Sequence, residues 1–335
     1  MVRCERPPRT KLTVVAPVYN EAAVIEEFVT EVRRHLETLA TISACEIVLV
    51  DDGSTDGSAA KLDALAARYP QEVKVVHLAR NFGHAAAVVA GLDYASGDAV
   101  ILMDSDLQDD PDAIPRMVEK WREGYRVVYA IRSSREESVS RRFLFTMFYR
   151  LLRILSETPF PLDAGNFSLM DRQVVDVLQS LPERNRYLPG LRAWTGFRQV
   201  GVPVARCRRR DCKSRVGLRG LWKLSMNAIF SFSYVPLLVF RLVGALSIGL
   251  SGLLMAYALG YKLFSAVTIP AWTSQVITTS FFGGINIFGI GILGEYIARI
   301  YDEMKKRPVY VVERLVPAES ASAAAQPGPC RQVAA

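Results

Sequence analysis

The sequence lacks the cysteine patterns of disulfide-rich and zinc-binding proteins. Its 335 residues include five cysteines, an odd and scattered set in which no two form a CxxC motif. Such a set supports neither a disulfide framework nor a zinc site, and it fits a reducing compartment. A secretory signal peptide is not evident either, because the first apolar stretch, residues 12–18, is short and is followed at once by Asn20 and Glu21. The N-terminal part is therefore expected to lie in the cytoplasm.

Two common phosphate-binding motifs are also missing. No GxGxxG follows the first predicted strand, and no GxxxxGK[ST] P-loop occurs in the chain. Both motifs bind phosphates through glycine-rich turns at helix N-termini, so the sequence does not predict a standard Rossmann dinucleotide site or a P-loop NTPase. A phosphate-bearing ligand would have to be bound in another way.

Charged residues are absent from two long stretches near the C-terminus. Twenty uncharged residues lie between Arg241 and Lys262, and no charge occurs between Lys262 and Glu295. About 20 apolar residues in a helix cross a hydrocarbon core of about 30 Å, so residues 242–261 and 275–294 are predicted to span a membrane. The alternative, a hydrophobic hairpin inside a soluble core, is disfavoured because such tandem runs are rare in soluble domains. Glycines within residues 283–294 predict close helix packing and allow self-association into a homo-oligomer.

Positive charge is concentrated ahead of these spans. The chain has 41 Lys and Arg against 34 Asp and Glu, and residues 192–223 alone hold ten basic residues and one acid. Nucleic acid, anionic lipid and phosphorylated ligands all suit such a block. Its position beside a span favours membrane lipid phosphate and disfavours nucleic acid. Basic residues at both outer ends of the span pair place those ends in the cytoplasm, as expected for a multi-pass protein of the cell inner membrane.

The first 132 residues alternate short β-rich runs with amphipathic helical patterns. Strands are predicted at residues 12–18, 46–52, 73–79, 99–105 and 126–132, and helices at 22–40, 57–69, 83–95 and 112–121. This alternation is typical of a doubly wound, mostly parallel α/β sheet that is covered on both faces. Ligands bind such sheets at the carboxyl ends of the strands.

The predicted strands become polar where they end. The fourth one runs into Asp104-Ser105-Asp106, and in extended backbone Asp104, Asp106 and Gln108 point to one side. Oxygen ligands of this kind suit a hard divalent cation that bridges to a diphosphate. Asp109 and Asp110, by contrast, precede Pro111 and are predicted to cap the following helix.

Five motifs in this order resemble one known family. They are PVYNE (17–21), VDDGSTDGS (50–58), RNFGH (80–84), DSDLQDDP (104–111), and GEYIARIYDEMKKRP (294–308) after the two spans. From about Leu12 to Glu313 the chain resembles bacterial polyisoprenyl-phosphate glycosyltransferases of glycosyltransferase family 2, relatives of dolichol-phosphate mannosyltransferase. The resemblance implies a GT-A-like fold and an inverting enzyme that moves a sugar from a nucleotide diphosphate to a polyprenyl phosphate.

The resemblance also implies a set of site residues. The nucleotide pocket would be lined by Pro17, Tyr19, Glu21, Asp51 and Asp52. The diphosphate and its Mg²⁺ or Mn²⁺ would be held by Asp104, Asp106 and Gln108, with Asp163 as a further catalytic candidate. The acceptor phosphate would meet Arg132, Arg135, Arg209, Ser214 and Arg215.

Two positions depart from the family pattern. Relatives often read R-x-A-G-x-S-K where this chain has RRDCKSR (209–215), so Cys212 replaces Gly and Arg215 replaces Lys. Many relatives also carry Asp where Asn166 stands, which puts an acid role at that position in doubt.

Six segments are expected along the chain. They are an N-terminal extension (1–11), a cytoplasmic catalytic domain (12–217), a juxtamembrane amphipathic helix (218–234), a two-span hairpin (235–298), a cytoplasmic segment (299–316) and a disordered tail (317–335). Residues 141–162 predict a second amphipathic helix, which either rests on the membrane or packs in the core.

UDP-glucose is the favoured donor, and GDP-mannose and a UDP-aminoarabinose derivative are the alternatives. Undecaprenyl phosphate is the expected acceptor. A processive polysaccharide synthase is disfavoured because no QxxRW motif occurs, and a catalytically silent membrane scaffold is disfavoured by the intact motif set.

Overall fold

The computed structural model describes residues 10–39, 42–132, 164–183, 188–204, 235–264 and 272–317. The described residues belong to two compact units. One contains residues up to 204 together with 307–317, and the other contains residues 235–306.

The first unit begins with the predicted alternation of strands and helices. Its elements are β1 (Lys11–Val18), α1 (Ile25–Glu37), β2 (Ala44–Asp51), α2 (Ser58–Arg68), β3 (Val73–Leu78), α3 (His84–Tyr94), β4 (Ala99–Leu102), α4 (Ala113–Arg122) and β5 (Val127–Arg132). Each strand and helix predicted in this region is present. The helix cap predicted at Asp109 and Asp110 is wrong, because Asp112 is the N-cap residue of α4 and its side chain makes no capping hydrogen bond. The Asp110 carboxylate accepts a hydrogen bond from the Asp112 amide (3.0 Å) in the turn before the helix.

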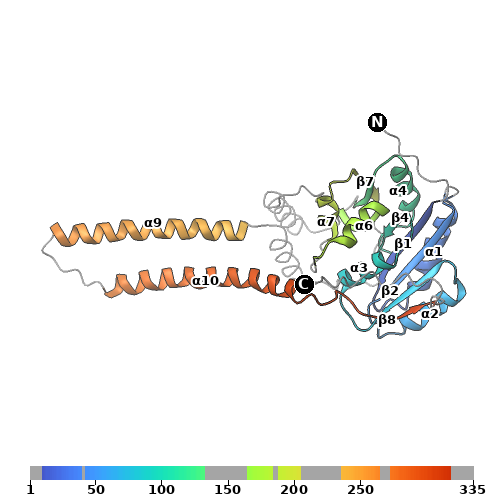
Figure 1. Cartoon of the computed structure of the whole chain (residues 1–335), viewed down its shortest axis with the longest axis horizontal. Helices are drawn as coiled ribbons and strands as arrows, with labels where there is room; N and C mark the ends of the chain where they lie inside the picture. The colour runs from blue at the N-terminus through green and yellow to red at the C-terminus, as the bar shows by residue number, and fades with distance from the viewer. Residues whose placement is uncertain are drawn as a thin grey trace, which may run out of the picture. The chain divides into compact units, whose positions relative to one another are not determined.

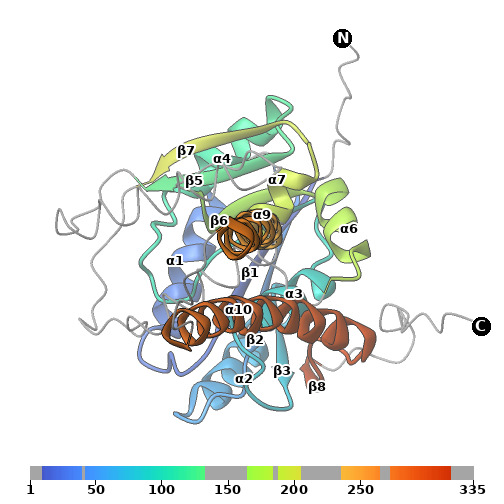
Figure 2. The ribbon, with the colours of Figure 1, turned by 90° about the vertical axis from the view of Figure 1, so that its left-hand side faces the viewer.

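Five further elements complete the first unit. They are β6 (Ala164–Asp171), α6 (Arg172–Ser180), α7 (Leu188–Trp194), β7 (Gln199–Val204) and β8 (Val312–Val316). The eight strands form one sheet in the order β7-β5-β6-β4-β1-β2-β3-β8, which runs from β7 and β5 at the top of Figure 2 to β3 and β8 at the bottom. β1 pairs in parallel with β2 and β4, and β2 with β3, whereas β6 and β8 run antiparallel to their neighbours.

Helices cover both faces of this sheet. On one side α1 contacts α2 and α4, and on the other α3 contacts α6, which contacts α7 (Figure 1). The central strands are apolar on both sides, and all residues of β1 from Leu12 to Val18 are buried. This confirms the predicted GT-A-like fold class, a doubly wound, mostly parallel α/β sheet.

The second unit consists of two long helices, α9 (Val235–Phe264) and α10 (Trp272–Met304). Leu237–Tyr257 and Phe281–Met304 are long and apolar enough to cross a membrane. The two predicted apolar helices are thus present, although the most apolar windows differ from 242–261 and 275–294 by several residues. Large apolar side chains such as Leu246 and Ile248 are 66% and 76% exposed, as expected for residues that face lipid.

Close helix packing involves one glycine in the described part of α10. A Cβ on Gly289 would overlap the Phe240 ring of α9, whereas Gly283, Gly284, Gly291 and Gly294 have no such neighbour within 4 Å. The prediction that glycines of residues 283–294 allow close helix packing is therefore confirmed at Gly289. It is wrong for the other four glycines as far as packing between α9 and α10 of one chain is concerned. The amphipathic helices predicted at 141–162 and 218–234, and the tail from 318, lie outside the described residues.

One buried carboxylate joins four elements of the first unit. Asp171 Oδ2 accepts hydrogen bonds from Trp121 Nε1 (2.8 Å) and Arg126 Nη1 (2.7 Å), and Oδ1 accepts one from the Gln173 amide (3.2 Å) at the start of α6. Asp171, the last residue of β6, thereby links α4, Arg126 at the start of β5, and α6. Its loss would leave a buried indole N–H and a guanidinium without their acceptor.

Asp171→Ala is expected to lower the free energy of unfolding by about 2 to 4 kcal/mol, because it removes a helix cap and leaves buried donors unpaired. Thermal unfolding of the detergent-solubilised protein measures the change. Asp176→Ala is the matched control, since Asp176 is 59% exposed and pairs with Arg172 on the surface of the same helix. A melting temperature equal to that of the control would contradict the role given to Asp171.

Candidate functional site

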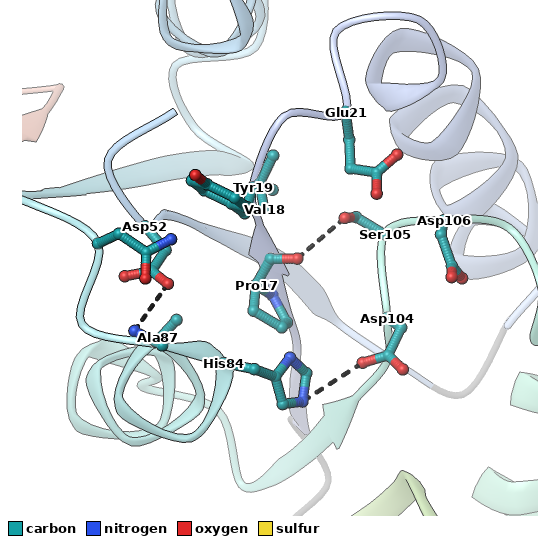
Figure 3. A pocket seen from close by; sticks show the side chains of 12 residues that line it. Pro17, Val18, Tyr19, Glu21, Asp52, His84, Ala87, Asp104, Ser105 and Asp106 are labelled. Carbon is teal, nitrogen blue, oxygen red and sulfur yellow. Dashed lines mark hydrogen bonds and ion pairs between the residues drawn. The ribbon is translucent and has the colours of Figure 1, made fainter. Parts of the chain in front are cut away.

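A pocket opens where β1, β2 and β4 end and α3 begins. Its volume is about 320 Å³. The lining residues are Pro17, Val18, Tyr19, Glu21, Asp52, Asn81, Gly83, His84, Ala87, Asp104, Ser105 and Asp106. Figure 3 shows their side chains around the end of β1, with Asp52 on one side and Asp104 and Asp106 on the other. The pocket lies at the sheet edge where the sequence predicted a ligand.

The loop after β1 is fastened to the loop after β2 by polar contacts. Asn20 has a positive φ of 55°, and its amide donates to Ser54 Oγ (3.1 Å) while its side-chain oxygen accepts from the Thr55 amide (2.8 Å). The Glu21 amide donates to Ser58 Oγ (3.0 Å). Asn tolerates this left-handed conformation better than most residues. The two loops therefore form one ordered wall.

Asp52 fastens the loop after β3 to the same wall. Its two carboxylate oxygens accept hydrogen bonds from the amides of Phe82 (2.7 Å) and Gly83 (3.0 Å). Burial raises the pKa of Asp52 above its usual value, although these two hydrogen bonds act in the opposite direction. Asp52 thus both lines the pocket and holds the Arg80–His84 turn in place.

Asp51 lies beside the pocket but is not among the lining residues. Its Oδ2 lies 2.9 Å from Nδ1 of the buried His77, and its Oδ1 accepts from the Ser54 amide (3.0 Å). Burial alone would raise the pKa of Asp51, but the hydrogen bonds from His77 and Ser54 outweigh it and lower that pKa. Asp51 therefore supports the pocket wall through its hydrogen bond with the Ser54 amide and does not line the pocket itself. Its predicted contact with the nucleotide stays a prediction.

Asp104 and Asp106 approach the pocket from the end of β4. The Ser105 hydroxyl between them donates to the Pro17 carbonyl (2.9 Å), which fixes this turn to β1 (Figure 3). The Gln108 amide donates to Asp106 Oδ1 (3.1 Å). The Gln108 side chain is buried and does not line the pocket, so its place among the metal ligands stays a prediction.

His84 is a pocket residue that the sequence reasoning did not single out. Its Nε2 lies 3.7 Å from Asp104 Oδ1 (Figure 3). The same nitrogen lies 2.9 Å from the side-chain nitrogen of Asn166 on β6. The RNFGH motif was the available signal, because its last residue begins α3 at the sheet edge. Asn166 therefore contacts the same His84 nitrogen that faces Asp104.

Two carboxylates on one side of the pocket fit a magnesium or manganese ion whose remaining ligands a substrate would supply. In the described part of the chain no three His, Cys, Asp or Glu side chains converge as a closed metal cage. Mg²⁺ in phosphate-transferring sites is commonly bound by one or two carboxylates together with substrate phosphates. Asp104 and Asp106 meet that requirement.

The acceptor-side predictions fall mostly outside the described residues. The predicted residues outside the described part of the chain are Asp163, Arg135, Arg209, Ser214 and Arg215. For Arg132 the structure gives the backbone position at the end of β5. One member of the basic block is corrected. Arg192 is buried, and its guanidinium donates to the Gly165 carbonyl (2.9 Å), so it holds β6 and α7 together and does not face lipid phosphate.

Comparison with known proteins gives matches over nearly the whole chain. Residues 13–178 match the model of glycosyl transferase family 2. The uncharacterized glycosyltransferase YkcC of Bacillus subtilis is 41% identical over 303 residues, which cover 90% of this chain and 93% of that protein. The SfII prophage-derived bactoprenol glucosyl transferase of Shigella flexneri is 37% identical over 305 residues, covering 91% of this chain and 98% of that protein.

Among solved structures, the mannosyltransferase PcManGT of Pyrobaculum calidifontis, in complex with GDP-Man and Mn²⁺, aligns with a TM-score of 0.45 and 19% identity over 88% of this chain and 87% of that one. These values are too low to carry over any feature of that protein.

Gly53→Ala is expected to disrupt the pocket wall. Gly53 has a φ of +69°, and a Cβ there would lie 2.7 Å from the backbone of Arg80 and Asn81, where β2 and β3 end. Overlap with backbone adds to conformational strain, so we expect a loss of about 2 to 4 kcal/mol in unfolding free energy. Thermal unfolding provides the measurement.

Gly57→Ala is the matched control. Gly57 has a φ of +88° but no neighbour within 4 Å of the added Cβ, so only the strain of about 1 kcal/mol should remain. Equal losses for the two variants would show that the close approach at Gly53 does not matter.

Proposed function

The chain belongs to glycosyltransferase family 2, and we propose that it transfers glucose from UDP-glucose to undecaprenyl phosphate with inversion at the anomeric carbon. The observation that carries this proposal is the match to a bactoprenol glucosyl transferase over 91% of this chain, together with an acidic pocket at the carboxyl ends of the parallel strands. Family membership alone supports a transferase. The lipid acceptor follows from the relative's name, and the donor and the stereochemistry are our proposals.

The charges of the pocket bear on how a diphosphate could enter it. Glu21, Asp52, Asp104 and Asp106 all line the pocket, and four carboxylates repel a ligand that is itself an anion. We propose that Asp104 and Asp106 hold Mg²⁺ or Mn²⁺ with the donor diphosphate. The bound cation would neutralise the diphosphate as it leaves.

The acceptor needs little activation in this proposal. A phosphomonoester has a second pKa of about 6 and is already ionised near neutral pH, so it can attack the sugar without a dedicated general base. The task of the protein is to hold two anions in line. Guanidinium groups bind phosphate well. The proposed acceptor-phosphate residues are therefore Arg132, Arg135, Arg209 and Arg215, together with Ser214. Asp163 is proposed to orient the donor or the acceptor.

The two apolar helices support an association with the membrane, where a polyprenyl phosphate resides. We propose a multi-pass protein of the inner membrane with its catalytic unit and both ends in the cytoplasm. Basic residues at both ends of the helix pair support this orientation.

The decisive experiment supplies membranes carrying the protein with labelled UDP-glucose, GDP-mannose or UDP-GlcNAc, plus undecaprenyl phosphate and Mg²⁺ or Mn²⁺. We expect label from UDP-glucose in a lipid that carries a single sugar, and α-to-β inversion in the product's anomeric NMR signal. Label in a long polymer would indicate a processive synthase. No transfer from any donor would favour a catalytically silent scaffold and overturn the proposal.

Asp106→Ala is expected to lower kcat/KM for transfer by about 100-fold or more, because the cation would lose one of its two proposed carboxylates. Asp110→Ala is the matched control: it removes a carboxylate from the same loop that does not line the pocket. Unchanged lipid labelling by the Asp106 variant would contradict the metal assignment. Equal losses in both variants would point to disruption of the loop itself.

A further inference from the structure

The chain returns to the catalytic unit after α10 and adds the last strand of the sheet. β8 pairs antiparallel with β3, with Arg314 opposite His77 (Figure 2). The segment before β8 is fastened as well, since the Ala79 amide donates to the Val311 carbonyl (2.9 Å) and the Tyr310 hydroxyl donates to Asp93 (2.8 Å). β8 thereby covers the edge that β3 would otherwise expose.

A row of polar side-chain contacts runs from β8 into the sheet. Arg314 binds Asp63 of α2 through two nitrogen–oxygen contacts of 3.0 and 2.7 Å. Asp63 Oδ1 lies 3.0 Å from His77 Nε2, and His77 Nδ1 lies 2.9 Å from Asp51 Oδ2. His77 is buried, so these two carboxylates are the partners of its ring nitrogens.

The donor and acceptor chemistry of this row is consistent along its length. Both ring nitrogens of His77 lie within hydrogen-bond distance of a carboxylate oxygen, and ionised carboxylates accept hydrogen bonds. Burial acts to raise the pKa of Asp63, but hydrogen bonds from Arg314 and His77 outweigh it and lower that pKa. The lowered pKa values of Asp51 and Asp63 favour the anionic carboxylates, and Asp63 faces the guanidinium of Arg314. Removing Arg314 would leave Asp63 with His77 alone.

The inner end of the row reaches the pocket wall. Asp51 also accepts from the Ser54 amide, and the Ser54 hydroxyl accepts from the Asn20 amide in the loop after β1. The next residue, Asp52, lines the pocket. The orientation of the Asp51 carboxylate therefore affects the turn on which the wall is built.

We propose that Arg314 is a positioning residue for the donor pocket, which acts through Asp63 and His77 to fix Asp51 and the turn that follows it. The C-terminal strand is then part of the donor site, although it lies beyond the membrane helices in the sequence. The effect on nucleotide binding rests on the proposed function. The effect on the order of the turn does not.

The exposure of the outer pair makes this role separable from stability. Side chains of Arg314 and Asp63 are 46% and 35% exposed, and pairs of this kind contribute little to global unfolding. A variant at Arg314 should therefore fold. Its consequence should be local, in the turn at residues 51–58.

The test compares Arg314→Ala, Arg314→Lys and Tyr310→Phe in the full-length protein in detergent. Tyr310→Phe is the matched control, since it removes a side-chain contact of the same C-terminal segment that does not lead to Asp51. Hydrogen–deuterium exchange of peptides covering residues 51–58 reports the order of the turn, and UDP titration with donor and acceptor KM values reports the site.

For Arg314→Ala we expect faster exchange in residues 51–58, and a donor KM and UDP Kd raised by roughly 3- to 10-fold, with acceptor KM unchanged. Arg314→Lys should recover part of both, and Tyr310→Phe should change neither. His77→Gln should act in the same direction, and the double variant with Arg314→Ala should lose less than the sum of the two.

Unchanged exchange at residues 51–58 in Arg314→Ala would overturn the positioning role, as would equal effects from Tyr310→Phe. Faster exchange with unchanged UDP Kd and donor KM would show that the row orders the turn without serving the donor site, and would also overturn it. If the wild-type protein used no nucleotide sugar, the proposed function would fail, and the exchange measurement would still decide whether Arg314 fixes the turn.

Discussion

Asp51 and Asp52 end a buried strand, and their carboxylates must be compensated because an unpaired charge is costly in a protein interior. The compensation of Asp52 comes from the amides after β3, and that of Asp51 from His77 and from the Ser54 amide. Ser54 in turn binds the amide of Asn20 after β1. The hydrogen bonds of these two adjacent acids thus connect the loops after β1, β2 and β3. The pocket wall is formed by these connected loops.

Much of this arrangement follows from local sequence patterns. The strands and helices up to residue 132 could be predicted because apolar periodicity and turn residues are local signals, and Asp104 and Asp106 were found because they follow a buried strand. The direction of Asp51 could not be predicted in this way. Neighbouring residues at the end of a strand point to opposite sides, and which side holds the partner, here His77, depends on the packing of β3 against β2.

β8 and Arg192 show the same limit. The pairing of β8 with β3 could not be predicted, because strand pairing across more than 200 residues leaves no periodic signal in either segment. Arg192 belongs by composition to the basic block, yet it is buried against the carbonyls of β6. In contrast, the apolar helices could be predicted from composition alone, since their lipid-facing surfaces need only length and the absence of charge. Packing details such as Phe240 against Gly289 could not.

Charge is segregated along the chain in a way that suits the proposed reaction. The described pocket carries four carboxylates and His84, whereas the arginines suggested for the acceptor lie between the last residue of β5 and the start of α9 in the sequence. An acidic pocket binds a diphosphate only together with a cation, and a basic segment binds a lipid phosphate without one. Each anion would then have its own means of neutralisation. Two phosphate-bearing substrates repel one another unless the charge of each is neutralised. Separate acidic and basic binding regions would therefore let the lipid phosphate approach and attack the sugar of the nucleotide diphosphate.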